Sequence, residues 1–416
     1  MELSNMNLLG INGLGRIGKL NLWKHIILDH FDGFVVNCGR EVGNNLDALI
    51  QTIDTDSTYG NLSHFLYGHC GKKYDLQVVD EEKKIFYLAG KYVKILSSDR
   101  NPKDIKWAPE NVRLVVDCTG KFLDPTIEPD QKNGSVRGHI EGGGAEKVIV
   151  SAPFKIKDKN LSMPEDAGMF VYGVNHTQFA PEKHNIISAA SCTTTALAHM
   201  MKPLVETRET NVIVTASMST IHATTNSQSI LDSVPKSGAK DLRKSRSIMN
   251  NMIITSTGAA KALEKILPEI SKIGFMADSV RIPTSTASLI TLNITLASKL
   301  NDSGEPTVTR SFINNMYKRY ADGPSQGLLV VSDRQNVSGD FIGYEAACII
   351  EGAETHTRTG FIDISSDKLA GIGIAIPHDI QIPVTHAKIY GWYDNEFGSY
   401  VNNLARLAIY VDKEIR

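Results

Sequence analysis

The chain is 416 residues long, with 42% hydrophobic residues, 22% charged residues and a formal net charge of −2 at pH 7. This length predicts two domains of ordinary size, and the composition is typical of a soluble globular protein. The near-zero charge gives no reason to expect nucleic acid or an anionic membrane surface as a partner. The sequence has no uninterrupted apolar run of about 18 residues, so we expect no transmembrane helix.

The five cysteines are few, odd in number and widely scattered, which is typical of a reducing compartment. Neither a Cys-x-x-Cys pair nor a histidine-rich tract indicates a metal site. We therefore expect a cytoplasmic protein without a bound metal.

The first motif is Gly-Leu-Gly-Arg-Ile-Gly at residues 13–18. A buried strand at residues 8–11 precedes it, and an amphipathic helix over residues 19–28 follows. Glycines in this context allow a tight turn and let the backbone approach a pyrophosphate at the helix N-terminus. An ordinary glycine-rich turn is the alternative, but the strand and helix favour a dinucleotide site.

A second strand, residues 33–37, ends where an acidic residue usually holds the ribose 2′-hydroxyl of NAD. Cys38 stands there instead, and Arg40 is close enough to meet the 2′-phosphate of NADP. Glu41 could simply neutralise Arg40. The sequence therefore leaves NAD and NADP open.

Strands over residues 112–117 and 147–153 continue the pattern, and both place small or hydroxyl residues at the carboxyl edge of a parallel sheet. Residues 123–144 are rich in proline, glycine and charge and predict a surface excursion. The N-terminal half is thus predicted to be an α/β domain with a Rossmann-type parallel sheet.

Cys192 lies between a strand at residues 185–188 and an apolar helix, with Ser191 as a suitable N-cap. The helix dipole and unpaired backbone N–H groups there favour a thiolate. His222, 30 residues further on, could act as its base. A buried cysteine and an ordinary histidine are the alternatives. Pro203 is expected to kink or end the helix.

The C-terminal half alternates apolar and polar residues over 211–218 and 288–297, which predicts an α+β domain with a mainly antiparallel sheet. Residues 229–252 are basic and irregular and predict an extended loop. Residues 255–263 resemble a capped helix start, which is a natural anion site. The final segment, residues 395–411, has helical periodicity.

Together these pieces resemble phosphorylating glyceraldehyde-3-phosphate dehydrogenase. The matching segments, in chain order, are residues 11–18 (INGLGRIG), 56–60 (DSTYG), 151–153 (SAP), 191–194 (SCTT), 222–223 (HA), 256–262 (STGAAKA), 281–284 (RIPT) and 392–398 (WYDNEFG). The resemblance implies an NAD(P)-binding domain over residues 1–191, completed by a C-terminal helix at 396–416, and a catalytic domain over 192–395.

The resemblance also implies residue roles. Cys192 would be the nucleophile and His222 the base. The implied cofactor-binding residues are Asn12, Gly13, Gly15, Arg16, Ile17, Gly18, Cys38, Arg40, Arg100, Thr119, Gly120, Ser151 and Asn395, the last of these at the nicotinamide carboxamide. The implied substrate- and phosphate-binding residues are Ser191, Thr193, Thr225, Ser227, Arg246, Thr257, Gly258 and Arg281. For Arg246, a solvated or subunit-facing charge run is the alternative.

The implied reaction converts glyceraldehyde 3-phosphate, NAD(P) and inorganic phosphate to 1,3-bisphosphoglycerate in a homotetramer. Three alternatives stay open: an erythrose-4-phosphate dehydrogenase, which Tyr393 disfavours, a non-phosphorylating aldehyde dehydrogenase, and a non-catalytic relative. The chain departs from the family at Cys38, and it carries extra residues around 123–134 and 342–359. The physiological direction, glycolytic or gluconeogenic, is also open.

Overall fold

The computed structural model describes residues 5–235 and 237–416 and divides into two compact units. The first unit runs to Cys192 and includes Glu396–Arg416, and the second unit is Thr193–Asn395. Within the described residues, no helix is both long enough and apolar enough to cross a lipid bilayer.

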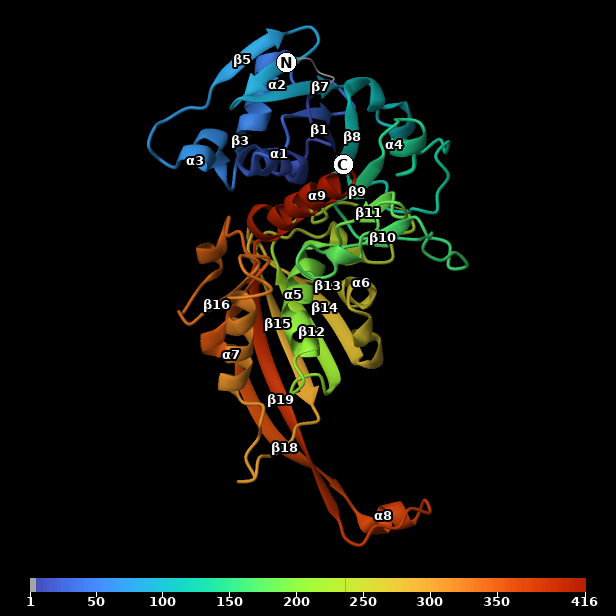
Figure 1. The fold of residues 1–416 in the computed structure, drawn as a ribbon, viewed down its shortest axis with the longest axis vertical. Coiled ribbons are helices and arrows are strands. Elements are labelled where there is room, and N and C mark those ends of the chain that lie inside the picture. Colours follow the sequence, from blue (N-terminus) through green and yellow to red (C-terminus); the bar gives the residue numbers. More distant parts are fainter. Residues whose placement is uncertain (1–4, 236) are drawn as a thin grey trace. The chain divides into compact units, whose positions relative to one another are not determined.

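A nine-stranded sheet forms the centre of the first unit (Figure 1). It is parallel except where β6 pairs antiparallel with β7 and with β5 at one end of the sheet, which confirms the predicted parallel sheet. In spatial order the strands are β10 (Ala167–Met169), β11 (Ile186–Ser188), β9 (Lys147–Val150), β8 (Val112–Asp117), β1 (Leu8–Asn12), β2 (Gly33–Asn37), β7 (Lys91–Leu96), β6 (Ile85–Leu88) and β5 (Leu76–Asp80). A separate pair is β3 (Thr55–Asp56) with β4 (Gly60–Asn61).

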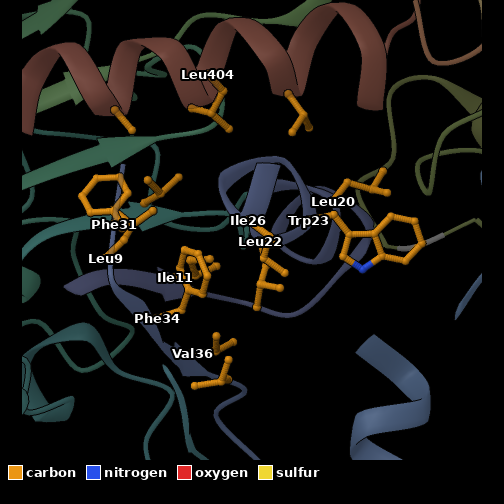
Figure 2. Close-up of a cluster of buried hydrophobic side chains, with 14 of the residues drawn as sticks. Leu9, Ile11, Leu20, Leu22, Trp23, Ile26, Phe31, Phe34, Val36 and Leu404 are labelled. Atoms are coloured by element: carbon orange, nitrogen blue, oxygen red, sulfur yellow. The ribbon is translucent and has the colours of Figure 1, made fainter. Parts of the chain in front are cut away.

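The helices of this unit are α1 (Arg16–Leu28), α2 (Leu46–Asp54), α3 (Leu62–Tyr67), α4 (Gly138–Glu141) and α9 (Asn402–Glu414), the last preceded by the π-helical turn η9 (Phe397–Val401). Figure 2 shows Leu404 of α9 facing the cluster that Leu20, Trp23 and Ile26 of α1 build over the sheet. The predicted amphipathic character of the first helix is therefore wrong. The C-terminal helix covers its second face, so residues 20–26 are all buried.

The predicted surface excursion is only partly a surface loop. Residues from Leu123 to Gly134 form a loop, but Ser135 and Val136 are buried and α4 buries His139 completely. From Ser135 to His139 that prediction is wrong, because Trp107 donates a hydrogen bond of 2.9 Å to His139 and binds the segment to the core, whereas Glu141, Gly142 and Gly144 are exposed as expected.

The second unit is built on an eight-stranded sheet in which most neighbours are antiparallel, as predicted; β12–β14 and β16–β17 are the parallel pairs. Burial alternates strictly along β15. In spatial order the strands are β13 (Ile253–Ser256), β14 (Gly274–Arg281), β12 (Ile213–His222), β15 (Ser288–Leu296), β19 (Ile380–Tyr393), β17 (Cys348–Glu351) and β16 (Leu329–Ser332), with β18 (His356–Ile364) paired to β19.

The helices of the second unit are α5 (Cys192–Glu206), whose first residue belongs to the first unit, α6 (Ala259–Ile266), α7 (Arg310–Ala321) and α8 (Ser366–Ala370). Of the two alternatives expected for Pro203, a kink or the end of the helix, the second is wrong, because α5 continues for three residues beyond it. Pro203 lies in the last turn and its carbonyl still accepts from the Thr207 amide at 3.1 Å, so only one helical hydrogen bond is forfeited.

Residues 342–359, where the sequence is longer than the family pattern, include Cys348–Glu351, a fully buried strand of the sheet, and the start of β18. Strands β18 and β19 extend beyond the other strands as a two-stranded arm that ends at α8 (Figure 1). The arm pairs residues from His356 with Lys388 to Ile364 with Ile380.

Candidate active site

Glycine stands at three positions of the fingerprint for three different structural reasons. Gly13 has a φ of +97°, a conformation that side chains disfavour. A Cβ on Gly18 would lie 1.9 Å from the Gly13 carbonyl oxygen, so α1 can approach the turn only with glycine there. A Cβ on Gly15, by contrast, would meet nothing within 4 Å. Gly15 is the N-cap of α1, and the space beside it is a cradle for an anion at the helix N-terminus.

Three strand ends meet at this turn and are joined by buried amide and carboxylate groups. Asn37 donates to Asn12 at 2.9 Å, and Asn12 donates to Asp117 at 2.8 Å. The other carboxylate oxygen of Asp117 accepts from the Thr119 amide and hydroxyl at 2.9 and 2.6 Å. The carboxyl ends of β2, β1 and β8 are thereby held in register, where the chain order reverses across the sheet and nucleotides bind.

A histidine behind this edge completes the network. Trp107 donates its indole N–H to His139 Nδ1, so the ring proton is on Nε2, which lies 3.0 Å from Asp117. Despite complete burial, these hydrogen bonds keep the pKa of Asp117 below its usual value. An ionised acceptor therefore fixes Thr119 at the cofactor edge.

A cavity of about 330 Å³ opens beside these strand ends. It brings together six of the predicted cofactor residues: Asn12, Gly13, Cys38, Arg40, Arg100 and Thr119. Lys121 and Phe122, which sequence reasoning missed, also line it. Both could have been predicted from the sequence, because they follow Thr119, a predicted cofactor residue, by two and three positions.

The cavity contains cations and no carboxylate. Burial raises the pKa of the Cys38 thiol to about 11, so a neutral group stands where an NAD-selective site has its acid. Glu41 does not neutralise Arg40: its carboxylate accepts from Lys84 at 2.7 Å and from Ser97 at 2.8 Å. Arg40 is exposed, and among the described residues no ion pair holds its charge.

The remaining predicted cofactor residues of this unit lie around the same turn. The Arg16 guanidinium forms ion pairs with Glu396 at 2.6 Å and with Asp56 at 3.4 Å. The group of Arg16 that can bind a phosphate is therefore its backbone N–H at the start of α1. Ile17 follows it and is half-buried. Gly120 has a φ of +65° and open space where a Cβ would stand, and Ser151 follows the end of β9. Sequence reasoning missed Glu396 and Asp56.

Cys192 is the first residue of α5, which places Ser191 at the N-cap position. Ala190, just before it, has a φ of +56°. This left-handed backbone is held from both sides, since Ser188 accepts from the Ala190 amide at 3.1 Å and Tyr400 donates to its carbonyl at 3.1 Å. The thiol is half-buried at a helix N-terminus, where the partial positive charge favours a thiolate.

In the second unit, His222 ends β12 and is in register with Arg281, the last residue of the parallel strand β14. His222 Nδ1 lies 2.6 Å from an Arg281 guanidinium nitrogen and 2.7 Å from the Ala223 carbonyl. Burial and the arginine charge lower the pKa of His222 to about 3, so the imidazole is neutral near pH 7. A neutral Nδ1 can accept from Arg281 or donate to Ala223, but not both.

Hydroxyl groups follow His222 on the next turn. Thr225 and Ser227 share a hydrogen bond of 2.9 Å, and Gln228 accepts from the Thr225 amide at 3.0 Å. Sequence reasoning missed Gln228, which closes this turn and so orients the hydroxyls.

Thr257 and Gly258 precede α6, with Gly258 at the N-cap and open space beside its Cα. Arg246 pairs with Asp232 at 3.0 Å and lines a cavity of about 270 Å³ with Arg243. None of the other predicted phosphate residues lines that cavity.

Asn395 and Thr193 differ in what they leave exposed to a ligand. Asn395 is buried, its side-chain oxygen accepts from Ser288 at 2.9 Å, and its NH₂ group has no partner among the described residues. A buried donor of this kind costs about 1–3 kcal/mol unless a ligand accepts from it, and a carboxamide oxygen would do so. The Thr193 hydroxyl is instead occupied by Tyr393 at 2.9 Å.

In the first unit, the open cradle at Gly15 and the cation-lined cavity fit a dinucleotide, and Cys192 stands at a helix start. In the second unit, Asn395 offers a buried amide donor and His222 lies beside Arg281. These features, each within its own unit, are typical of a nicotinamide-dependent oxidoreductase.

Comparisons with known proteins agree. Residues 7–125 match the model of the glyceraldehyde 3-phosphate dehydrogenase NAD binding domain, and residues 191–395 match that of the C-terminal domain. Glyceraldehyde-3-phosphate dehydrogenase 2 of Streptomyces avermitilis is 34% identical, with 98% of each chain covered. Glyceraldehyde-3-phosphate dehydrogenase 1 of Bacillus cereus is 32% identical, again with 98% of each chain covered. Glyceraldehyde-3-phosphate dehydrogenase 2 of Caenorhabditis elegans is 33% identical, with 97% of each chain covered. The chain belongs to the glyceraldehyde-3-phosphate dehydrogenase family, and it is an oxidoreductase that uses NAD(P).

Proposed function

We propose that this chain catalyses the oxidative phosphorylation of glyceraldehyde 3-phosphate to 1,3-bisphosphoglycerate, with Cys192 as nucleophile and His222 as base. The observation that carries the proposal is the match to both family domains, over residues 7–125 and 191–395, with Cys192 at the first residue of α5. The three alternative activities gain no support from any observation.

In the proposed reaction, the Cys192 thiolate adds to the aldehyde carbon and forms a hemithioacetal. The Cys192 backbone N–H at the helix start stabilises the oxyanion that this addition forms. A proton from water converts the oxyanion to the hydroxyl of the hemithioacetal, and His222 removes that proton when the carbon is oxidised. Bound NAD(P)⁺ supplies the hydride acceptor. The resulting thioester is then cleaved by inorganic phosphate, which releases the acyl phosphate and regenerates the thiolate.

Arg281 and Thr225 are proposed to hold the substrate phosphate, and Ser191, Thr257 and Gly258 the attacking phosphate. A phosphate that binds Arg281 draws the guanidinium charge away from His222 Nδ1. Nδ1 then donates to the Ala223 carbonyl, and Nε2 is left as the basic nitrogen. Substrate binding would thus set the tautomer that the base needs.

We also propose that the cofactor site accepts NADP as well as NAD. We call the cavity of about 330 Å³ the adenosine-side cavity. The support is that Arg40 is exposed, that Cys38 is neutral, and that no carboxylate stands among the described residues that line this cavity.

A homotetramer in the cytoplasm is proposed from the family. Apolar side chains of the 229–252 loop support assembly, since Leu231 is 73% exposed and Val234 91% exposed. Light scattering should give a mass four times the 45.6 kDa of the chain. A monomeric mass would refute the assembly, and secretion of a tagged protein would refute the location.

Reduced-nicotinamide formation from glyceraldehyde 3-phosphate tests the reaction. Turnover should require inorganic phosphate and should be lost in Cys192→Ser, while Cys70→Ser, which alters an exposed cysteine, should keep it. Equal rates without phosphate would point to thioester hydrolysis and refute the proposed activity.

A further inference from the structure

A second cavity of the first unit, of about 450 Å³, lies outside the proposed catalytic residues. The loop from Leu123 to Gly134, which is extra relative to the family pattern, forms one wall, and residues 155–157 form another. Its size is within the range of about 300–1,000 Å³ that small-molecule sites occupy. Five cations line it, and we call it the basic pocket: Arg100, Lys121, Lys132, Lys155 and Lys157.

The basic pocket has a large excess of positive charge. Asp124 is the one carboxylate that lines it. That carboxylate accepts from the Thr126 amide and hydroxyl at 3.1 and 2.6 Å and from the Lys157 backbone amide at 2.9 Å. Within residues 5–235 and 237–416, none of the five cations forms an ion pair.

The other two acidic residues of the loop do not compensate these cations. Glu128 and Asp130 are exposed and are absent from the cavity wall, so Asp124 alone offsets five positive charges there. Like charges that converge on one concave surface repel each other, and a bound anion offsets this repulsion.

The loop is anchored, so the pocket exists without a ligand. Ser135 donates to the Ile127 carbonyl at 2.5 Å, and Arg137 donates to the Pro125 carbonyl at 2.7 Å. The Lys155 amide donates to the Leu123 carbonyl at 2.8 Å, which ties the two walls together. A preformed site avoids the cost of ordering a loop on binding.

We propose that the basic pocket binds a small polyanion with clustered phosphate groups. Ammonium and guanidinium groups on opposite walls can each take a different phosphate oxygen, which a ligand of one negative charge would not use. Phe122, Leu123 and Ile127 supply an apolar flank on the same cavity.

The basic pocket also shares Arg100, Lys121 and Phe122 with the adenosine-side cavity. Arg100 donates to the Gly39 carbonyl at 2.9 Å and so belongs to the turn that follows β2. If the proposed cofactor site is correct, a polyanion and the 2′-phosphate of NADP draw on the same cations. The ligand then weakens NADP binding more than NAD binding, and by linkage NADP weakens the ligand to the same degree.

Calorimetric titration of the full-length protein, saturated with NAD, with inorganic tripolyphosphate tests the site. One ligand should bind per chain. The affinity should fall at least tenfold in the double variant Lys155→Gln/Lys157→Gln. The charge-matched control Lys159→Gln/Lys183→Gln alters two exposed lysines outside the cavity and should stay within twofold of the parent.

Absence of binding, or equal affinity in the pocket variant and the control, would overturn the proposal. Retained NAD affinity in both variants shows that they fold, so a failure here is distinct from a failure of the dehydrogenase function. Repeating the titration with NADP-saturated protein separates the two phosphate sources: weaker tripolyphosphate binding than with NAD supports shared cations. Loss of NADP affinity in the pocket variant without any tripolyphosphate binding would mean that the cavity serves the cofactor alone, and it would refute a separate ligand.

Discussion

At the scale of single residues, burial and the contact with Arg281 together control the proposed base, His222. Burial opposes protonation most, and a guanidinium 2.6 Å from Nδ1 adds to this effect, which brings the pKa of the imidazole to about 3. The base is therefore neutral before substrate arrives. Its strength depends on what binds Arg281.

Arg281→Gln removes that charge and should raise the pKa of His222 from about 3 towards the ordinary 6.5. Burial remains, so the rise should be incomplete. Histidine NMR titration measures it, with His25 of the other unit as an internal control that should not move. An unchanged His222 titration would show that burial alone sets its pKa.

Arg40→Gln should raise the KM for NADP about tenfold, equivalent to about 1.4 kcal/mol, and leave the KM for NAD within twofold. The matched control is Glu41→Gln, which alters the partner of Lys84 and should affect neither cofactor strongly. If Glu41→Gln instead strengthened NADP use, Glu41 would be neutralising Arg40 after all.

At the scale of elements, the turn into α1 separates steric from ligand-related reasons for glycine. Gly15→Ala meets no neighbour within 4 Å and has a φ of −73°, so the fold should tolerate it. The new methyl fills the cradle, and NAD affinity should fall at least tenfold with an unchanged melting temperature. Gly18→Ala, whose Cβ would lie 1.9 Å from a carbonyl oxygen, should lower the melting temperature. The opposite pattern would place the pyrophosphate elsewhere.

Helix α1 also carries a fully buried histidine. Burial lowers the pKa of His25 to about 3, so the unfolded chain binds a proton between pH 6.5 and 3 that the folded chain does not. Stability should fall as the pH falls through that window, by about 1.4 kcal/mol per pH unit for this histidine. When the free energy of unfolding is measured by denaturant titration at several pH values, His25→Leu should reduce its slope against pH by that amount. A slope unchanged by the variant would mean that His25 is protonated in the fold.

Strands were the elements that the sequence predicted best. Residues 8–11, 33–37 and 112–117 are runs of buried residues, and their structure follows from local composition. Errors arose where distant segments decide the environment. Helix α9 buries the second face of α1 from almost 400 residues away, and Trp107 holds His139 inside.

At the scale of the whole molecule, the chain distributes its chemistry over two units. Cys192 ends the first unit, His222 lies in the second, and Asn395 is the last residue before the chain returns to the first. Sequence motifs predicted these residues, because each one follows a strand or starts a helix and so stands in a recognisable local pattern. The hydrogen bond between Thr193 and Tyr393 and the His222–Arg281 contact depend on packing between distant segments and have no sequence signature.

The basic pocket shows the same limit. Net charge near zero excluded a strongly charged surface on average, yet residues 100, 121, 132, 155 and 157 converge on one cavity. The net charge of the chain carries no information about this local excess of positive charge. The excess depends on how the loop at residues 123–134 packs against residues 155–157.

Intact-protein mass spectrometry after incubation with glyceraldehyde 3-phosphate and NAD, without inorganic phosphate, tests the proposed chemistry most directly. Each chain should gain one 3-phosphoglyceroyl group, peptide mapping should place it on Cys192, and added phosphate should remove it as acyl phosphate. No adduct, or an adduct on any of the other four cysteines, would contradict the proposed mechanism.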